Sequence, residues 1–154
     1  MASSPAPATT PRLLVEIMVP GVDSSVPLLR HVLKLALELA GHDNSYAARL
    51  VTSELVTNAV EHTFSARSGG VVTLVLTEIG NGMVRIEVMD EGAFTVPRCR
   101  IPQMDECSGR GLLLVRDVSV RCGCSDGPFG GHVVWAEVST SGSASPAADG
   151  FSHA

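Results

Sequence analysis

The chain has 154 residues, of which 45% are hydrophobic and 18% charged, and its formal net charge is −5. This length and composition suit one globular domain with a hydrophobic core. The basic residues are scattered arginines and the single Lys34, which argues against direct nucleic-acid binding, and no signal peptide or membrane-spanning apolar run is evident, so we expect a cytoplasmic protein.

Both ends of the sequence are predicted to be disordered tails. Residues 1–11 contain Ala, Ser, Thr and Pro with almost no large apolar side chain, and residues 140–154 return to Ser, Ala and Gly. Such segments cannot bury enough apolar surface to offset the entropy of ordering. We therefore expect one folded domain over residues 12–139.

Hydrophobic periodicity divides this domain into strands and helices. The expected elements are, in order, a strand at 12–19, a helix ending near 40, a helix from 43–45 to 62, strands at 71–79 and 83–90, a helix opening at 109–111, and strands at 119–125 and 132–138. The order β-α-α-β-β-α-β-β predicts an α+β fold. Its helices would cover one face of a mixed, mainly antiparallel sheet in a two-layer sandwich.

Local signals support several of these boundaries. Residues 23–25, Asp-Ser-Ser, are N-cap candidates for the first helix, and Gly41 is placed to cap its C-terminus. The tripeptide Gly80-Asn81-Gly82 tolerates positive φ angles, which predicts a hairpin between the second and third strands.

The second helix contains the sequence LVTSELVTNAVEH at residues 50–62, and its two sides differ in character. The packing side is predicted to hold Ala48, Thr52, Leu55, Val56, Ala59 and Val60, and the opposite side Glu54, Asn58, Glu61 and His62. Glu54 and Asn58 are four residues apart, so their side chains can converge on one ligand. The alternative interpretation is an ordinary solvated helix face.

Two further features could complete a nucleotide site with this helix. Asp90, where a strand ends, can accept a hydrogen bond from an exocyclic amine, and Gly92 lets the backbone pass close to a flat base. Gly109 and Gly111 at a helix N-terminus can present backbone N–H groups to an anion. Each feature alone is more often a turn or a capping pair, but their joint order is much less expected by chance.

The helix residues have matching chemistry. Asn58 can offer a neutral oxygen to Mg²⁺, a hard cation that prefers oxygen ligands. Glu54 can accept a proton from an attacking hydroxyl group or water molecule.

The cysteines are expected to be free thiols. Their spacing, C-x7-C-x14-C-x-C, matches no common zinc pattern, and a reducing cytosol disfavours disulfides. A zinc site or a structural disulfide is the minor alternative for the four residues Cys99, Cys107, Cys122 and Cys124.

Four segments together resemble the GHKL (Bergerat-fold) ATPases, and among them the bacterial anti-sigma-factor serine/threonine kinases. SELVTNAVEH resembles the N box, VMDEG the adenine box, SGRGLLLV the phosphate box and GGHVVWAEV the closing strand, so the resemblance covers roughly residues 12–139. It implies Glu54 as catalytic base, Asn58 as Mg²⁺ ligand, Asp90 as adenine reader with Gly92 beside it, and Gly109, Arg110 and Gly111 around the phosphates.

The sequence departs from the family pattern in three respects. Phe94 stands where the adenine box usually has a second glycine, and Val133 replaces a threonine whose hydroxyl would help to hold adenine. The aperiodic segment 93–108, expected to form a lid, contains no lysine. Besides Arg110, this leaves Arg98 and Arg100 as candidate cations for a γ-phosphate.

The resemblance implies a kinase that binds ATP or ADP with Mg²⁺, sequesters a sigma factor and phosphorylates a serine of an anti-anti-sigma (STAS-type) antagonist, with a homodimer possible by analogy. The alternative is a module of the same fold that acts by sequestration alone, with weak or no phosphotransfer. A sensor-kinase catalytic fragment is a weaker third interpretation. Among the remaining residues, His62 could contact the lid or a partner, Val134 and Trp135 are expected in the core, and Arg116 and Arg121 are expected as exposed charges.

Overall fold

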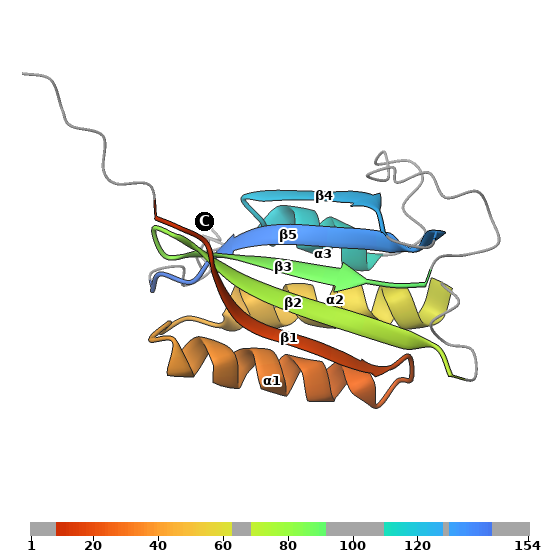
Figure 1. Ribbon diagram of the computed structural model, residues 1–154. Coiled ribbons are helices and arrows are strands. Elements are labelled where there is room, and N and C mark those ends of the chain that lie inside the picture. Colours follow the sequence, from red (N-terminus) through yellow and green to blue (C-terminus); the bar gives the residue numbers. More distant parts are fainter. Residues whose placement is uncertain (1–8, 63–68, 92–109, 128–129, 143–154) are drawn as a thin grey trace, which may run out of the picture.

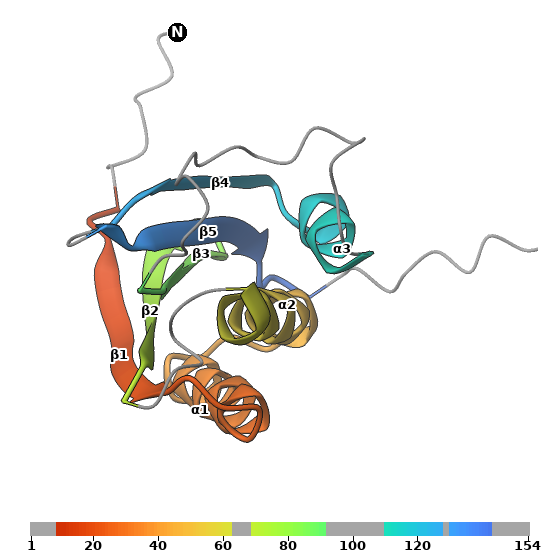
Figure 2. The ribbon, with the colours of Figure 1, turned by 90° about the vertical axis from the view of Figure 1, so that its right-hand side faces the viewer.

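The computed structural model describes residues 9–62, 69–91, 110–127 and 130–142. These residues form β1 (Arg12–Pro20), α1 (Ser25–Leu39), α2 (Tyr46–His62), β2 (Val71–Gly80), β3 (Met83–Met89), α3 (Arg110–Val118), β4 (Arg121–Asp126) and β5 (His132–Ser139). The strands make one sheet in the order β1-β2-β3-β5-β4, and all four described pairings are antiparallel. All three helices lie on one face of the sheet (Figures 1 and 2), which confirms the predicted two-layer α+β sandwich.

The two predicted glycine turns are present. Gly41 has φ +84°, and the N–H groups of Gly41 and His42 donate to the carbonyls of Glu38 and Leu37, a Schellman motif that ends α1. The β2–β3 turn has positive φ at Gly80, Asn81 and Gly82. The N-cap prediction was less accurate, because Ser24 at the N-cap of α1 makes no side-chain capping hydrogen bond.

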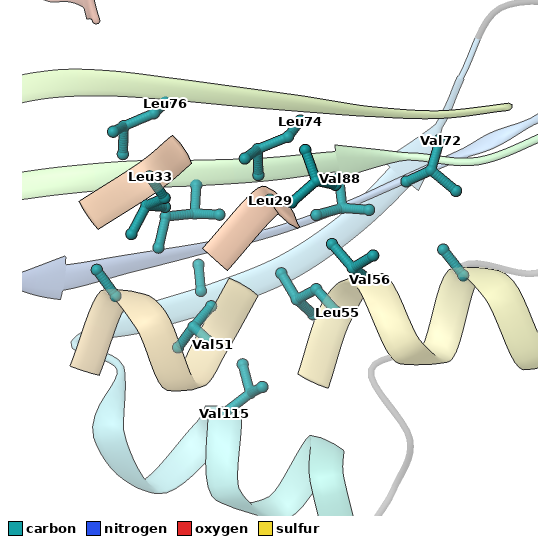
Figure 3. Close-up of a cluster of buried hydrophobic side chains, with 14 of the residues drawn as sticks. Leu29, Leu33, Val51, Leu55, Val56, Val72, Leu74, Leu76, Val88 and Val115 are labelled. Atoms are coloured by element: carbon teal, nitrogen blue, oxygen red, sulfur yellow. The ribbon is translucent and has the colours of Figure 1, made fainter. Parts of the chain in front are cut away.

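The core lies between the sheet and the helices, and Figure 3 shows Leu29 and Leu33 of α1 facing the same layer as Leu74 and Leu76 of β2. Inward-facing residues of β2 and β3 alternate with more exposed ones, as a sheet covered on one face requires. A fully buried leucine contributes about 2 kcal/mol relative to an exposed one. This core therefore fixes which face of each strand meets the helices.

The helix α2 occupies the middle of the helix layer, between α1 and α3 (Figure 2). The six residues predicted for its packing side are all buried: Ala48, Thr52, Leu55, Val56, Ala59 and Val60. Val51 is also fully buried and lies beside Val115 of α3 (Figure 3). The packing side is thus wider than predicted, because a second helix covers part of it.

None of the described helices has the length and apolarity that a membrane span needs.

Candidate functional site

The two polar residues of the predicted site helix lie on α2, one turn apart. Glu54 and Asn58 are both half-buried, while Glu61 further along is exposed. The helices α1 and α3 flank α2 and the sheet lies beneath it, and Glu54 and Asn58 are on the side of α2 that these elements leave partly open. Two adjacent half-buried oxygen-bearing side chains can hold a ligand between them, whereas fully exposed ones would stay hydrated.

Asp90 directly follows β3, and its position is fixed by β5. Its backbone N–H donates to the carbonyl of His132 over 2.9 Å, and its Oδ1 accepts the backbone N–H of His132 over 3.2 Å. In a regular antiparallel pair the second acceptor would be the backbone carbonyl. The side chain of Asp90, only 4% exposed, therefore stands in for that carbonyl.

His132 also brings its side chain close to the same carboxylate, with Nδ1 3.5 Å from Oδ1 of Asp90. Residues 84, 86 and 88 of β3 and 136 and 138 of β5 face the helices. By the two-residue period of a strand, Asp90 and His132 lie on this helix-covered face as well. A carboxylate and an imidazole thus border the same side of the sheet as Glu54 and Asn58.

The start of α3 supplies backbone groups. Arg110 and Gly111 lie in the first turn of this helix, and that turn itself contains no acidic residue. The backbone N–H groups of a first helical turn have no partner within the helix and can bind an anion. Gly92 and Gly109, together with Phe94, Arg98 and Arg100, lie outside the described residues.

These elements meet at one end of the domain. In Figure 1, α2 and β3 end, and β5 begins, at the same end. β4 pairs antiparallel with β5 and so finishes there too. Because α3 precedes β4 by only residues 119–120, α3 must begin at this end. The chain therefore gathers Asn58, Asp90 and the first turn of α3 at one edge of the sandwich.

The sequence matches a known family over most of its length, residues 20–136. The chain belongs to the histidine kinase-like ATPase domain family. Among solved structures it is similar to that of the RsbU and RsbW domains of Rv1364c from Mycobacterium tuberculosis, with a TM-score of 0.57 and 23% identity over 85% of this chain. The match covers 32% of that chain, and at this identity it supports the fold alone. No curated protein matches the sequence.

Trp135 does not lie in the core, where the sequence predicted it. Trp135 is half-buried on the sheet face away from the helices, where Arg85 lies 4.0 Å from its ring centroid. Its neighbour Val134 does pack against the core, as expected. The alternation of residues along a strand shows which side chains share a face, but not which face the helices cover. Trp135 was therefore assigned to the wrong face of the sheet.

The same face carries an ion-pair cluster that the sequence did not indicate. Glu137, with its side chain 7% exposed, accepts from Arg85 over 3.1 Å and from Arg121 over 2.8 Å. Arg121 was expected to be an exposed charge without a role, and its side chain is 68% exposed, yet it forms this pair. The only indication of this pair in the sequence is that Arg121 and Glu137 have opposite charges, on two strands that are neighbours in the sheet.

The prediction of free thiols is confirmed for Cys122 and wrong for Cys124. Cys122 is a free, half-buried thiol, whereas Cys124 is engaged in a disulfide. Cys99 and Cys107 lie outside the described residues. Within the described ranges no group of three or more His, Cys, Asp or Glu side chains could hold a metal ion.

Proposed function

We propose that this ATPase domain binds ATP with Mg²⁺ at the end of the sandwich where α2 and β3 end and α3 and β5 begin. The observation that carries this proposal is the gathering of Asn58, Asp90 and the α3 start at one edge in a chain of this family. Asp90 is held by the backbone of His132 and is therefore preorganised to accept the exocyclic amine of adenine. The first turn of α3 offers N–H groups to the phosphates.

The donor set at this edge fits a magnesium ion. Asn58 offers a neutral amide oxygen from a half-buried position, and Mg²⁺ usually takes one or two protein oxygens while phosphates and waters complete its octahedron. When bound, the ion would neutralise phosphate charge during phosphoryl transfer. From the sequence, Arg110 is the cationic candidate beside the phosphates, with Gly92, Gly109 and Gly111 shaping the base and phosphate regions.

We further propose a serine/threonine protein kinase of the anti-sigma type. Glu54 removes the proton from the serine hydroxyl of an anti-anti-sigma antagonist, the serine oxygen bonds to the γ-phosphorus, and the bond to the β,γ-bridging oxygen breaks to release ADP. The partner held in the absence of that antagonist would be a sigma factor, which places the protein in the cytoplasm. A homodimer remains a prediction by analogy.

The second candidate function is sequestration without phosphotransfer. In the sequence, Phe94 and Val133 favoured it. Val133 alternates with Val134 and Ala136, which pack in or against the core, so it lies on the sheet face away from the helices. A threonine at this position would point its hydroxyl away from Glu54 and Asn58. Of the two departures, only Phe94, outside the described residues, still supports this candidate.

Calorimetric titration of ATP and of ADP, each with Mg²⁺, tests nucleotide binding. We expect a Kd in the micromolar range and at least tenfold weaker binding, about 1.4 kcal/mol, for Asn58→Ala, because the metal loses its amide oxygen. Asn81→Gly is the matched control: it also removes an asparagine side chain, but at the opposite end of the domain, where φ of +55° suits glycine.

Two outcomes of this titration would contradict the proposal. Absence of heat at millimolar nucleotide would exclude the kinase and leave the sequestration module as the function. Equal weakening by Asn58→Ala and Asn81→Gly would show that binding does not depend on this edge of the sandwich.

A further inference from the structure

A partly buried polar cluster lies at the other end of the sandwich from the proposed nucleotide site. His42 follows the Schellman motif that ends α1, and its side chain is only 9% exposed. Its ring lies between Glu78 near the end of β2 and Thr140 just after β5. No local sequence pattern predicts this cluster, which we call the His42 latch and define as Arg12, His42, Glu78, Thr140 and the carbonyl of Gly82.

The contacts of the latch are short and continuous. His42 Nδ1 lies 2.6 Å from Thr140 Oγ1, and His42 Nε2 lies 2.6 Å from Glu78 Oε2. Thr140 Oγ1 in turn lies 3.0 Å from the carbonyl oxygen of Gly82 in the β2–β3 turn. The other carboxylate oxygen of Glu78, Oε1, accepts from Arg12 at the start of β1 over 3.1–3.2 Å.

Counting hydrogens in these contacts shows which protonation of the ring satisfies all of them. The Gly82 carbonyl can only accept, so the contact at 3.0 Å uses the single hydroxyl hydrogen of Thr140. That hydroxyl then accepts from Nδ1 of His42, which must carry a hydrogen. Nε2 faces a carboxylate and must carry one as well. All three contacts are hydrogen bonds at once only when His42 is an imidazolium.

The surroundings agree with a positive ring. Of the two groups that contact His42 from neighbouring elements, Glu78 on β2 is negatively charged and Thr140 is neutral, and the Gly82 carbonyl that contacts Thr140 is neutral as well. Arg12 on β1 shares the other oxygen of Glu78. On its own segment, Glu38 and Asp43 are exposed acidic residues, and Glu38 is paired with Lys34.

The carboxylate partner is held in its charged form. The hydrogen bond from His42, opposed by partial desolvation and aided by the charge of Arg12, lowers the pKa of Glu78 below its usual value. The stability that the ionised carboxylate of Glu78 contributes is thus present at neutral pH, and it is lost only as the pH falls through the folded-state pKa of Glu78.

We propose that the His42 latch is a pH-sensitive device that closes the end of the domain remote from the nucleotide site while His42 is protonated and loosens as the ring loses its proton. Deprotonation turns the Thr140 hydroxyl from Gly82 toward Nδ1, and replaces the ion pair between the ring and Glu78 by a hydrogen bond from a neutral ring to the carboxylate. The latch joins β1, the α1–α2 connection, the β2–β3 turn and the end of β5, so loosening acts on four segments together.

The sign of the effect follows from linkage. A proton that is bound through contacts present only in the folded chain contributes stability at low pH, and this stability is lost as the pH rises through the range in which histidines titrate, about pH 5 to 8. Urea unfolding at pH 6 and pH 8 measures this. We expect the unfolding equilibrium constant of the wild type to rise severalfold more over this interval than that of His42→Gln, whose amide does not titrate.

His31→Gln is the matched control, because His31 is an exposed histidine on α1 and its loss should leave the wild-type pH dependence unchanged. Nitrogen-15 NMR of the His42 ring in the wild type tests the charge directly, without a variant that could fail to fold. We expect two protonated ring nitrogens at pH 6. A neutral ring at pH 6, or the same pH dependence for the wild type and His42→Gln, would overturn the proposal.

Discussion

At the scale of single residues, Asp90 combines a structural and a proposed functional role. Its Oδ1 accepts the backbone N–H of His132 and so completes the last rung between β3 and β5. A backbone donor is supplied by almost any residue type, so this support does not depend on the histidine side chain. The sequence could predict Asp90 as a strand-end carboxylate, but its partner, 42 positions away, could not be predicted from local pattern.

Two substitutions of Asp90 separate these roles. Asp90→Asn keeps an oxygen that can accept from His132, so we expect a change in unfolding free energy within about 1 kcal/mol, whereas Asp90→Ala leaves a buried N–H unpaired and costs about 1–3 kcal/mol. Urea denaturation checks this. Both variants should bind ATP more weakly, because adenine loses its charged acceptor. Equal stability of the two variants would contradict the structural role.

At the scale of elements, the sequence predicted all the described helices and strands to within a few residues at their ends, because strong periodicity and glycine punctuation are local signals. It failed where long-range packing decides. Val51 is buried by α3, Trp135 lies on the open sheet face, and Thr140, which the sequence placed in the second tail, is 2% exposed and hydrogen-bonded in the His42 latch.

The open face of the sheet is organised around Trp135. A Cβ built on Gly123 of β4, its cross-strand partner in β5, would lie 2.7 Å from Cζ2 of Trp135, so the indole ring lies directly over the glycine. Arg85 lies near the ring centroid and reaches Glu137. The glycine therefore allows the tryptophan to lie flat within the ion-pair cluster.

Gly123→Ala tests this arrangement. We expect it to displace the ring and to cost about 1–3 kcal/mol of unfolding free energy, the usual range for overpacking. Fluorescence of Trp135, the only tryptophan, reports both the ring environment and urea unfolding. Gly142→Ala is the control, since a Cβ there meets nothing within 4 Å. Similar effects of the two substitutions would contradict the close contact.

At the scale of the whole molecule, the sandwich has two ends with different chemistry. One end gathers Asn58, Asp90 and the start of α3, and the other holds the His42 latch. The sequence motifs predicted the first end because each lies within a short segment. They could not predict the latch, whose His42 and Thr140 are 98 residues apart and make contact only because the α1–α2 connection meets the end of β5.

The central claim is that nucleotide binds at the first of these ends, and the most direct test is to follow backbone amide chemical shifts by NMR while ATP with Mg²⁺ is added. We expect the largest changes at Asp90, His132, the last turns of α2 and the first turn of α3, with little change at His42 and Asn81. Changes centred on the His42 latch, or no saturable changes at millimolar nucleotide, would contradict the account.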